Sequence, residues 1–164
     1  MKGLGIGFPV QEDLQLFIHI DGASKGNPGR AGAGIWIRNG VGRTLLKTSR
    51  YLGQKTNNEA EYWALLLGLR EAKRLKGASV HIFTDSELIE RQVEGVYRVK
   101  DLKLKPLHRA VMQNLNEFSF FEIQGIPREQ NDEADRLANQ AIRRRIEKEK
   151  GGGESRRRTD GRSS

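Results

Sequence analysis

The spacing of apolar residues changes from a period of two to a period of about 3.6 along this chain, which limits the folds available to it. Residues 14–20 alternate leucine and isoleucine with other residues and end at Asp21, so they are predicted to form a buried strand. The glycine-rich segment 22–34 is predicted to be a turn. The remaining predicted strands are 33–38, 43–52, 80–84 and 118–124, and the predicted helices are 56–75, 86–94, 106–116 and 131–147.

The order of these elements predicts the fold class. Three strands come first, and Asn39-Gly40 between the second and third is a strong hairpin signal, so these strands are expected to be antiparallel. The later strands alternate with helices, which is typical of a sheet covered by helices. The sequence therefore predicts an α/β fold with a five-stranded mixed sheet flanked by helices. Ligands of such sheets bind at the carboxyl ends of strands, where Asp21 and Asp85 lie.

Charge is distributed unevenly along the 164 residues, a length that corresponds to one domain. The net charge of +8 suggests a phosphate-rich partner, either nucleic acid or an anionic membrane. Residues 143–164 contain nine Lys or Arg against four Asp or Glu and contribute +5, whereas residues 1–142 contribute +3. We expect an N-terminal extension at 1–13, one domain at 14–147, and a basic, disordered tail at 148–164 whose end is too polar to fold.

The absence of cysteine excludes several kinds of chemistry. A chain with no cysteine has neither a disulfide framework, nor thiolate catalysis, nor cysteine-bound zinc. Glycines and a proline interrupt the apolar residues of 1–10, so this segment is predicted to be neither a signal peptide nor a membrane span. We therefore expect a soluble, cytoplasmic, monomeric protein without a membrane partner, in which any metal ion is held by oxygen atoms.

Two acidic residues occupy helix positions that are predicted to face the sheet. Glu61 shares a helix face with Leu65 and Gly68, at offsets of four and seven residues. Asp135 similarly shares a face with Ile142. Burying an unpaired carboxylate costs several kcal/mol unless the group is protonated, so both residues need a cation or strong hydrogen-bond donors.

Each acid taken alone also has a simple structural explanation, as a helix cap, a strand-end turn or a surface residue. Together, however, Asp21 and Asp85 at strand ends and Glu61 and Asp135 on inward helix faces would bring four carboxylates near one point. Their mutual repulsion favours bound divalent cations. Oxygen ligands suit Mg²⁺ or Mn²⁺, and two such ions about 3.5 to 4 Å apart are a common device for phosphodiester hydrolysis.

Four short motifs carry these acids, in a fixed order over residues 14–145. They are Asp21-Gly22-Ala23-Ser24 with Gly26-Asn27-Pro28-Gly29, Thr56-Asn57-Asn58 with Glu61, Thr84-Asp85-Ser86, and Asn131 with Asp135-Arg136-Leu137-Ala138. Any single motif is weak evidence, but the set in this order is highly specific. The chain resembles type 1 ribonuclease H.

This resemblance implies a ribonuclease H-like fold and an endonuclease that hydrolyses the RNA strand of RNA/DNA hybrids, leaving 5′-phosphate and 3′-hydroxyl ends. It implies that Asp21, Glu61, Asp85 and Asp135 are the catalytic residues and hold two Mg²⁺ ions, with Mn²⁺ as an alternative. Contacts to the 2′-hydroxyl would distinguish RNA from DNA. The substrate-binding residues that it implies are Gly22, Ser24, Gly26, Asn27, Thr56, Asn57, Asn58 and Glu87.

The chain departs from the family pattern at two places. Many relatives have a histidine after the fifth strand where this chain has Gly125, so either Arg128 or Glu129 partly fills its role or turnover proceeds without it. A basic, tryptophan-bearing helix of some bacterial relatives is replaced by the shorter segment 95–105. Two alternatives therefore stay open: an idle module that binds hybrids or double-stranded RNA, and a broader nuclease that also cuts double-stranded RNA or RNA–DNA junctions.

Overall fold

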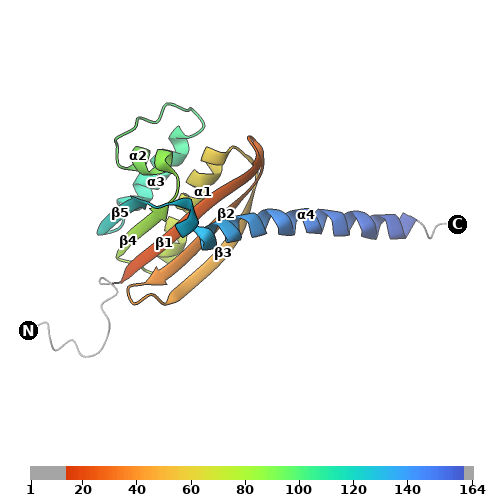
Figure 1. Cartoon of the computed structure of the whole chain (residues 1–164), viewed down its shortest axis with the longest axis horizontal. Helices are drawn as coiled ribbons and strands as arrows, with labels where there is room; N and C mark the ends of the chain where they lie inside the picture. Colours follow the sequence, from red (N-terminus) through yellow and green to blue (C-terminus); the bar gives the residue numbers. More distant parts are fainter. Residues whose placement is uncertain (1–13, 161–164) are drawn as a thin grey trace, which may run out of the picture.

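The computed structural model describes residues 14–160, with side chains as far as residue 152 (Figure 1). The predicted N-terminal extension, residues 1–13, lies outside this range, as do residues 161–164. No helix in the described part of the chain is long and apolar enough to cross a membrane. The elements in chain order are β1 (Gln15–Gly26), β2 (Gly29–Asn39), β3 (Thr44–Lys55), α1 (Asn57–Arg74), β4 (Ser79–Thr84), α2 (Glu87–Val93), α3 (Lys105–Leu115), β5 (Phe120–Gly125), a 3₁₀ turn (Arg128–Gln130) and α4 (Asp132–Asp160).

The strands form one mixed sheet in the order β3-β2-β1-β4-β5. The β1–β2 and β2–β3 pairs are antiparallel, because short connections can join only antiparallel neighbours. The β1–β4 and β4–β5 pairs are parallel, and a connection containing helices precedes the second strand of each pair. The predicted fold class, a five-stranded mixed sheet with three antiparallel strands first, is confirmed.

Helices cover the two faces of the sheet unequally. On one face, α1 packs its apolar side on β1 and β2, and α3 packs beside it; Ile18, Leu65 and Leu69 are fully buried there. On the other face, α4 crosses β1, β2 and β3 (Figure 1). Gly32 and Gly34 of β2 face α4, and a Cβ atom on either would lie within 2.3 Å of an α4 carbonyl oxygen. The missing side chains therefore let α4 pack close to the sheet.

The segment 22–34, predicted to be a turn, is mostly strand, so that prediction is wrong. β1 continues to Gly26 and β2 begins at Gly29, which leaves only Asn27 and Pro28 in the turn. Glycine inside a strand marks either a turn or a place where another backbone comes close. Most of the glycines in this segment lie where a helix backbone comes close to the strand. The sequence pattern alone did not distinguish such a close approach from a turn.

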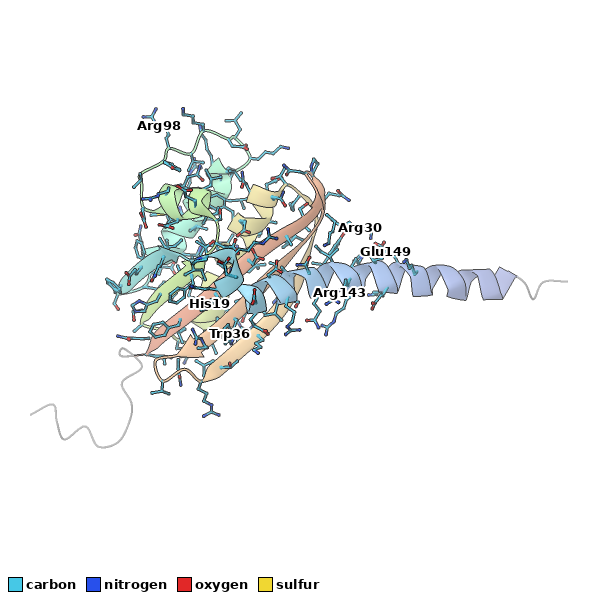
Figure 2. All side chains as sticks on the ribbon, in the orientation of Figure 1. His19, Arg30, Trp36, Arg98, Arg143 and Glu149 are labelled. Carbon is cyan, nitrogen blue, oxygen red and sulfur yellow. The ribbon has the colours of Figure 1, made fainter. Side chains whose placement is uncertain are left out.

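The sequence predicts a disordered tail at 148–164, and in the structure α4 continues into this segment as far as Asp160. The last fully buried side chain of α4 is that of Ile142. Farther along, Glu149 pairs with Arg30 (Figure 2). The Arg145 guanidinium lies 5.1 Å from the centre of the Tyr51 ring. A segment too polar to fold alone can still extend an anchored helix, because each added residue gains a hydrogen bond without a new nucleation cost.

Candidate active site

Three of the predicted acids come together at the point where β1 and β4 stop pairing. The β1–β4 ladder ends at His19 and Phe83, so the two strands separate just before Asp21 and Asp85. Glu61 approaches from the second turn of α1 and is only 8% exposed. Each of Asp21, Glu61 and Asp85 offers a carboxylate oxygen, and these three oxygens lie within 4.8 Å of one another.

The start of α1 is fixed beside β1 by a cap and by a glycine. Thr56 accepts a hydrogen bond from the Glu59 backbone at 3.2 Å, and the Glu59 side chain accepts one from the Thr56 backbone at 3.0 Å, which forms a capping box. A Cβ atom on Gly22 would lie 2.2 Å from the carbonyl carbon of Ala60 and 2.4 Å from the backbone nitrogen of Glu61. Glycine at position 22 therefore sets the short distance that brings Glu61 to Asp21.

The fourth predicted acid, Asp135, lies in the first turn of α4 and lines the same pocket, which has a volume of about 440 Å³. Its carboxylate is close enough to Asp21 to raise the pKa of that residue. It is not one of the three acids whose oxygens lie within 4.8 Å of one another. The Asn139 side chain donates to Asp135 Oδ1 at 3.2 Å and to the Asp135 carbonyl at 3.0 Å, which fixes the side chain at the rim.

The acids are held where their negative charge is unfavourable without a cation. Burial raises the pKa of Asp21, and the adjacent Glu61 raises it further. Burial also raises the pKa of Glu61, although hydrogen bonding with Asp21 and the charge of Arg128 oppose this effect. Glu61 Oε2 is buried and has no hydrogen-bond partner among the described residues. Clustered carboxylate oxygens with an unused lone pair are suitable ligands for Mg²⁺ or Mn²⁺.

Asn131 links the two strands that carry the aspartates. Its side chain is 1% exposed, and Nδ2 donates to the carbonyl oxygen of Ile20 at 2.9 Å and to Asp85 Oδ2 at 3.2 Å. The sequence had indicated that Asn131 faces inward together with Asp135, and the structure adds the partners of its amide group. The ends of β1 and β4 are thus joined beside the acids, just beyond their last ladder pair.

The predicted substrate-binding residues of the β1–β2 turn and the start of α1 are tied to one another. Asn27 Oδ1 accepts a hydrogen bond from the Asn57 backbone at 3.0 Å. The Ser24 hydroxyl makes hydrogen bonds with the carbonyl oxygens of Gly26 and Lys55, the second at 2.9 Å. Gly26 has a φ of 136°, in the region that favours glycine. Of this predicted set, Gly22, Ser24 and Asn57 line the pocket with the acids.

The other predicted substrate-binding residues lie outside the pocket lining. Thr56 is occupied as the cap of α1, and Asn58 is exposed in its first turn. Glu87, at the start of α2, is exposed and accepts a hydrogen bond from the Tyr97 hydroxyl at 3.3 Å. Sequence reasoning missed two polar residues that do line the pocket, Lys25 and Asn139. Asn139 could have been found, because it lies one helical turn after Asp135.

Of the two residues predicted to take over the role of the absent histidine, one lines the pocket and the other does not. A Cβ atom on Gly125 would lie 1.8 Å from Glu90 Oε2, so the Glu90 side chain fills the space beside this position. Arg128, in the 3₁₀ turn that follows, lines the pocket, and its charge lowers the pKa of Glu61. Glu129 does not line the pocket.

Comparison with known proteins identifies the family of this chain. A family described as reverse transcriptase-like matches residues 19–141. Ribonuclease HI of Halobacterium salinarum is 35% identical over 135 residues, which cover 81% of this chain and 68% of that protein. The chain belongs to the type 1 ribonuclease H family. The resemblance inferred from the four motifs is thereby confirmed.

Solved structures of ribonuclease H agree with this assignment. The crystal structure of RNase H1 from Halobacterium salinarum has a TM-score of 0.77 and 34% identity, covering 78% of this chain and 97% of that one. LC11-RNase H1 in complex with an RNA/DNA hybrid has a TM-score of 0.76 and 39% identity, covering 80% and 99%. A bifunctional protein of Mycobacterium tuberculosis is 35% identical over 130 residues. Those residues cover 79% of this chain but only 36% of the mycobacterial protein, so the ribonuclease H domain corresponds to part of that relative.

Proposed function

We propose that this ribonuclease H domain is an endonuclease that hydrolyses the RNA strand of RNA/DNA hybrids by a two-metal-ion mechanism, leaving 5′-phosphate and 3′-hydroxyl ends. The observation that carries the proposal is the cluster of Asp21, Glu61 and Asp85, whose oxygens lie within 4.8 Å of one another in a member of this family. The relative LC11-RNase H1, solved in complex with an RNA/DNA hybrid, supports the same substrate class.

The donor set fits two Mg²⁺ ions or, as an alternative, two Mn²⁺ ions. Asp21, Glu61 and Asp85 would hold them together with Asp135, and the unpartnered Glu61 Oε2 is an available ligand atom. When bound, the two ions would supply activation of a water molecule and stabilisation of charge on the leaving oxygen. Within the chain, Asn131 keeps the Asp85 carboxylate in position for this role.

The hybrid is proposed to bind along the β1–β2 turn and the start of α1. Backbone N–H groups at a helix start and amide side chains are suited to phosphate oxygens and sugar hydroxyls. The hydrogen bond between Asn27 and Asn57 holds these two elements in one orientation beside the acids. Contacts from this region to the 2′-hydroxyl would select RNA as the strand that is cut. The residues proposed to contact the substrate are Gly22, Ser24, Gly26, Asn27, Thr56, Asn57, Asn58 and Glu87.

Arg128 is proposed to take over part of the function of the absent histidine. Among the residues lining the pocket, it supplies a permanent positive charge close enough to lower the pKa of Glu61. A guanidinium cannot serve as a proton-transfer base, so its role is to bind the phosphate oxygens of the substrate or product. Glu129, outside the pocket lining, has no such role.

One assay tests the function and its alternatives. End-labelled hybrid, double-stranded RNA and an RNA–DNA junction are each incubated with the protein, with and without Mg²⁺. Cutting of the hybrid only with Mg²⁺ is expected, and the new 5′ ends should accept phosphate from a polynucleotide kinase only after phosphatase treatment. Binding without cutting would instead support the idle module, and cutting of the other two substrates would support the broader nuclease.

Replacement of a single carboxylate tests the metal assignment. Asp85→Asn should abolish cutting while the protein still folds, because a ligand is lost but the shape of the side chain is kept. Asp132→Asn is the matched control, because Asp132 is an exposed acid outside the pocket lining. Cutting by Asp85→Asn at the rate of the unmodified protein would rule out the assignment. A cytoplasmic location, a monomeric state and the lack of a membrane partner stay predictions from the sequence.

A further inference from the structure

The pocket that holds the acids extends beyond them along β1 and α4. Four residues after Asp21, Lys25 contributes to the pocket lining from β1, and Asn139 contributes from α4, one helical turn after Asp135. A strand rises about 3.3 Å per residue, so the backbone at Lys25 lies about 13 Å from the backbone at Asp21. The pocket is therefore longer than the acid cluster, and its lining beyond the acids includes a lysine.

Lys25 is one of two positively charged residues that line this pocket, and the other is Arg128. Arg128 belongs to the 3₁₀ turn that precedes α4, and its charge acts on Glu61. Lys25 instead lies near the end of β1, two residues before Asn27 of the β1–β2 turn. The acids therefore have one cation in the turn that follows β5 and a second one toward the β1–β2 turn.

The fold gives Lys25 no partner of opposite charge. In the β1–β2 ladder Lys25 lies directly opposite Arg30, and like charges that face each other across two strands are destabilising. Glu149 of α4 pairs with Arg30 (Figure 2) and also accepts a hydrogen bond from Arg145. Among the residues whose side chains the structure describes, Lys25 forms no ion pair. Its charge does not stabilise the fold and is available to a ligand.

A phosphate group of the strand that is cut is the ligand that fits this charge. Asp21 and Lys25 are four residues apart on one strand, so their side chains point to the same face of the sheet. A nucleic-acid strand with its scissile phosphate at Asp21 that continues along this pocket carries its next phosphates toward Lys25. The ammonium group has three donors and no acceptor, and it binds phosphate as a point charge. Because the pocket with the acids is proposed to hold the RNA strand, this phosphate belongs to the RNA.

We propose that Lys25 binds the RNA phosphate next to the scissile one, on the side of the β1–β2 turn. Lys25 thereby adds a substrate contact to the proposed nuclease function, on which this assignment rests. Contacts to phosphate position a strand but carry no base information. The Lys25 contact therefore helps to fix which linkage lies over the acids, and it acts equally on hybrids of every sequence.

The salt dependence of hybrid binding tests this contact. Affinity is measured in Mg²⁺ on the Asp85→Asn protein, which is expected to leave the hybrid uncut. Adding Lys25→Met should lower the affinity about three- to tenfold and reduce the slope of log affinity against log salt by about 0.9, whereas Lys25→Arg should keep both. Lys76→Met is the matched control, because Lys76 is exposed just beyond the end of α1 and outside the pocket lining. A slope that Lys25→Met leaves unchanged would overturn the proposal.

Neutral linkages in the substrate identify the phosphate that Lys25 contacts. A methylphosphonate after a single 2′-deoxynucleotide removes the charge of one RNA-strand linkage, and the same deoxynucleotide with an ordinary phosphate is the control. At the linkage beside the cut, this change should slow cutting by the unmodified protein but cause no further loss in Lys25→Met.

An equal loss in both proteins at every RNA-strand linkage would overturn the proposal. It would also be overturned if the two proteins differ only at linkages of the DNA strand, because Lys25 would then bind the other strand. Failure of the unmodified protein to cut the unmodified hybrid in Mg²⁺ would instead overturn the nuclease function itself, and the Lys25 contact with it. The two failures are thus distinguished by whether the unmodified hybrid is cut.

Discussion

The amide of Asn131 donates a hydrogen bond of 3.2 Å to the carboxylate of Asp85. The same Nδ2 atom donates to the carbonyl of Ile20 at 2.9 Å, so one buried side chain connects the strand ends that carry Asp21 and Asp85. β1 and β4 no longer pair at this point, and Asn131 replaces the missing ladder bond. The acids are therefore held by side-chain hydrogen bonds at a place where the backbone ladder no longer holds the strands.

Asn131→Ala is expected to lower the affinity for Mg²⁺ by about 10- to 100-fold, because a residue that orients a metal ligand is lost. The measurement is the Mg²⁺ dependence of both the cutting rate and the thermal midpoint of unfolding. Asn116→Ala is the control, because Asn116 is exposed at the end of α3. A Mg²⁺ dependence equal to that of the unmodified protein in both measurements would show that Asn131 does not orient the site.

Gly22→Ala is expected to destabilise the protein by about 1–3 kcal/mol or more and to lower activity strongly, because the new Cβ would meet backbone atoms of α1 at 2.2–2.4 Å. Urea unfolding and hybrid cutting measure the two effects. Gly40→Ala is the matched control, since a Cβ there has no other atom within 4 Å. Equal stability of the two alanine variants would contradict the close approach of α1 to β1.

Asp21→Asn is expected to raise the stability of the metal-free protein at neutral pH, because the pKa of Asp21 is raised by burial and by Glu61. An acid whose pKa is raised by folding binds more protons in the folded state than in the unfolded state. The free energy of unfolding therefore falls as pH rises above the unfolded value of about 4. In EDTA, the thermal midpoint of unfolding should fall less for Asp21→Asn than for the unmodified protein as the pH rises from about 4 to neutral. Added Mg²⁺ should raise the midpoint of the unmodified protein only. If Asp21→Asn is less stable than the unmodified protein in EDTA at neutral pH, burial of the Asp21 carboxylate is not unfavourable.

His19 is expected to make stability rise with pH between about 4 and 6.5. Burial lowers the pKa of His19 to about 4, and the charge of Arg38 acts in the same direction. The unfolded chain binds more protons than the folded chain in this window, so the free energy of unfolding increases with pH, by at most about 3 kcal/mol. His19→Phe should remove this contribution, as measured by the difference between variant and unmodified protein in urea unfolding at each pH. A difference that does not change with pH would contradict it.

Arg128→Ala is expected to lower the cutting rate about tenfold, which corresponds to the loss of one charge-assisted hydrogen bond to phosphate. Glu129→Ala should leave the rate unchanged, because this neighbour is outside the pocket lining. Steady-state cutting of the hybrid by both variants is the measurement. If both retain the full rate, turnover does not depend on either residue.

The fold and much of the candidate site follow from sequence spacing. The period of the apolar residues located all five strands and the four helices, and helical spacing alone indicated that Glu61 faces the sheet, where it is 8% exposed. Spacing could not show that Gly22 touches the backbone of α1, because that contact depends on how two elements pack. For the same reason it could not show that Glu90 fills the space beside Gly125. The assignment of ligand and substrate-binding roles stays a prediction.

The unbroken course of α4 has a mechanical consequence. Its first turn carries Asp135 at the pocket, and Glu149 lies about 21 Å farther along the helix axis, where it is clamped to Arg30. Packing on β2 near Asp135 and the pair with Arg30 farther along together fix the direction of α4, and with it the position from which Asp135 enters the pocket.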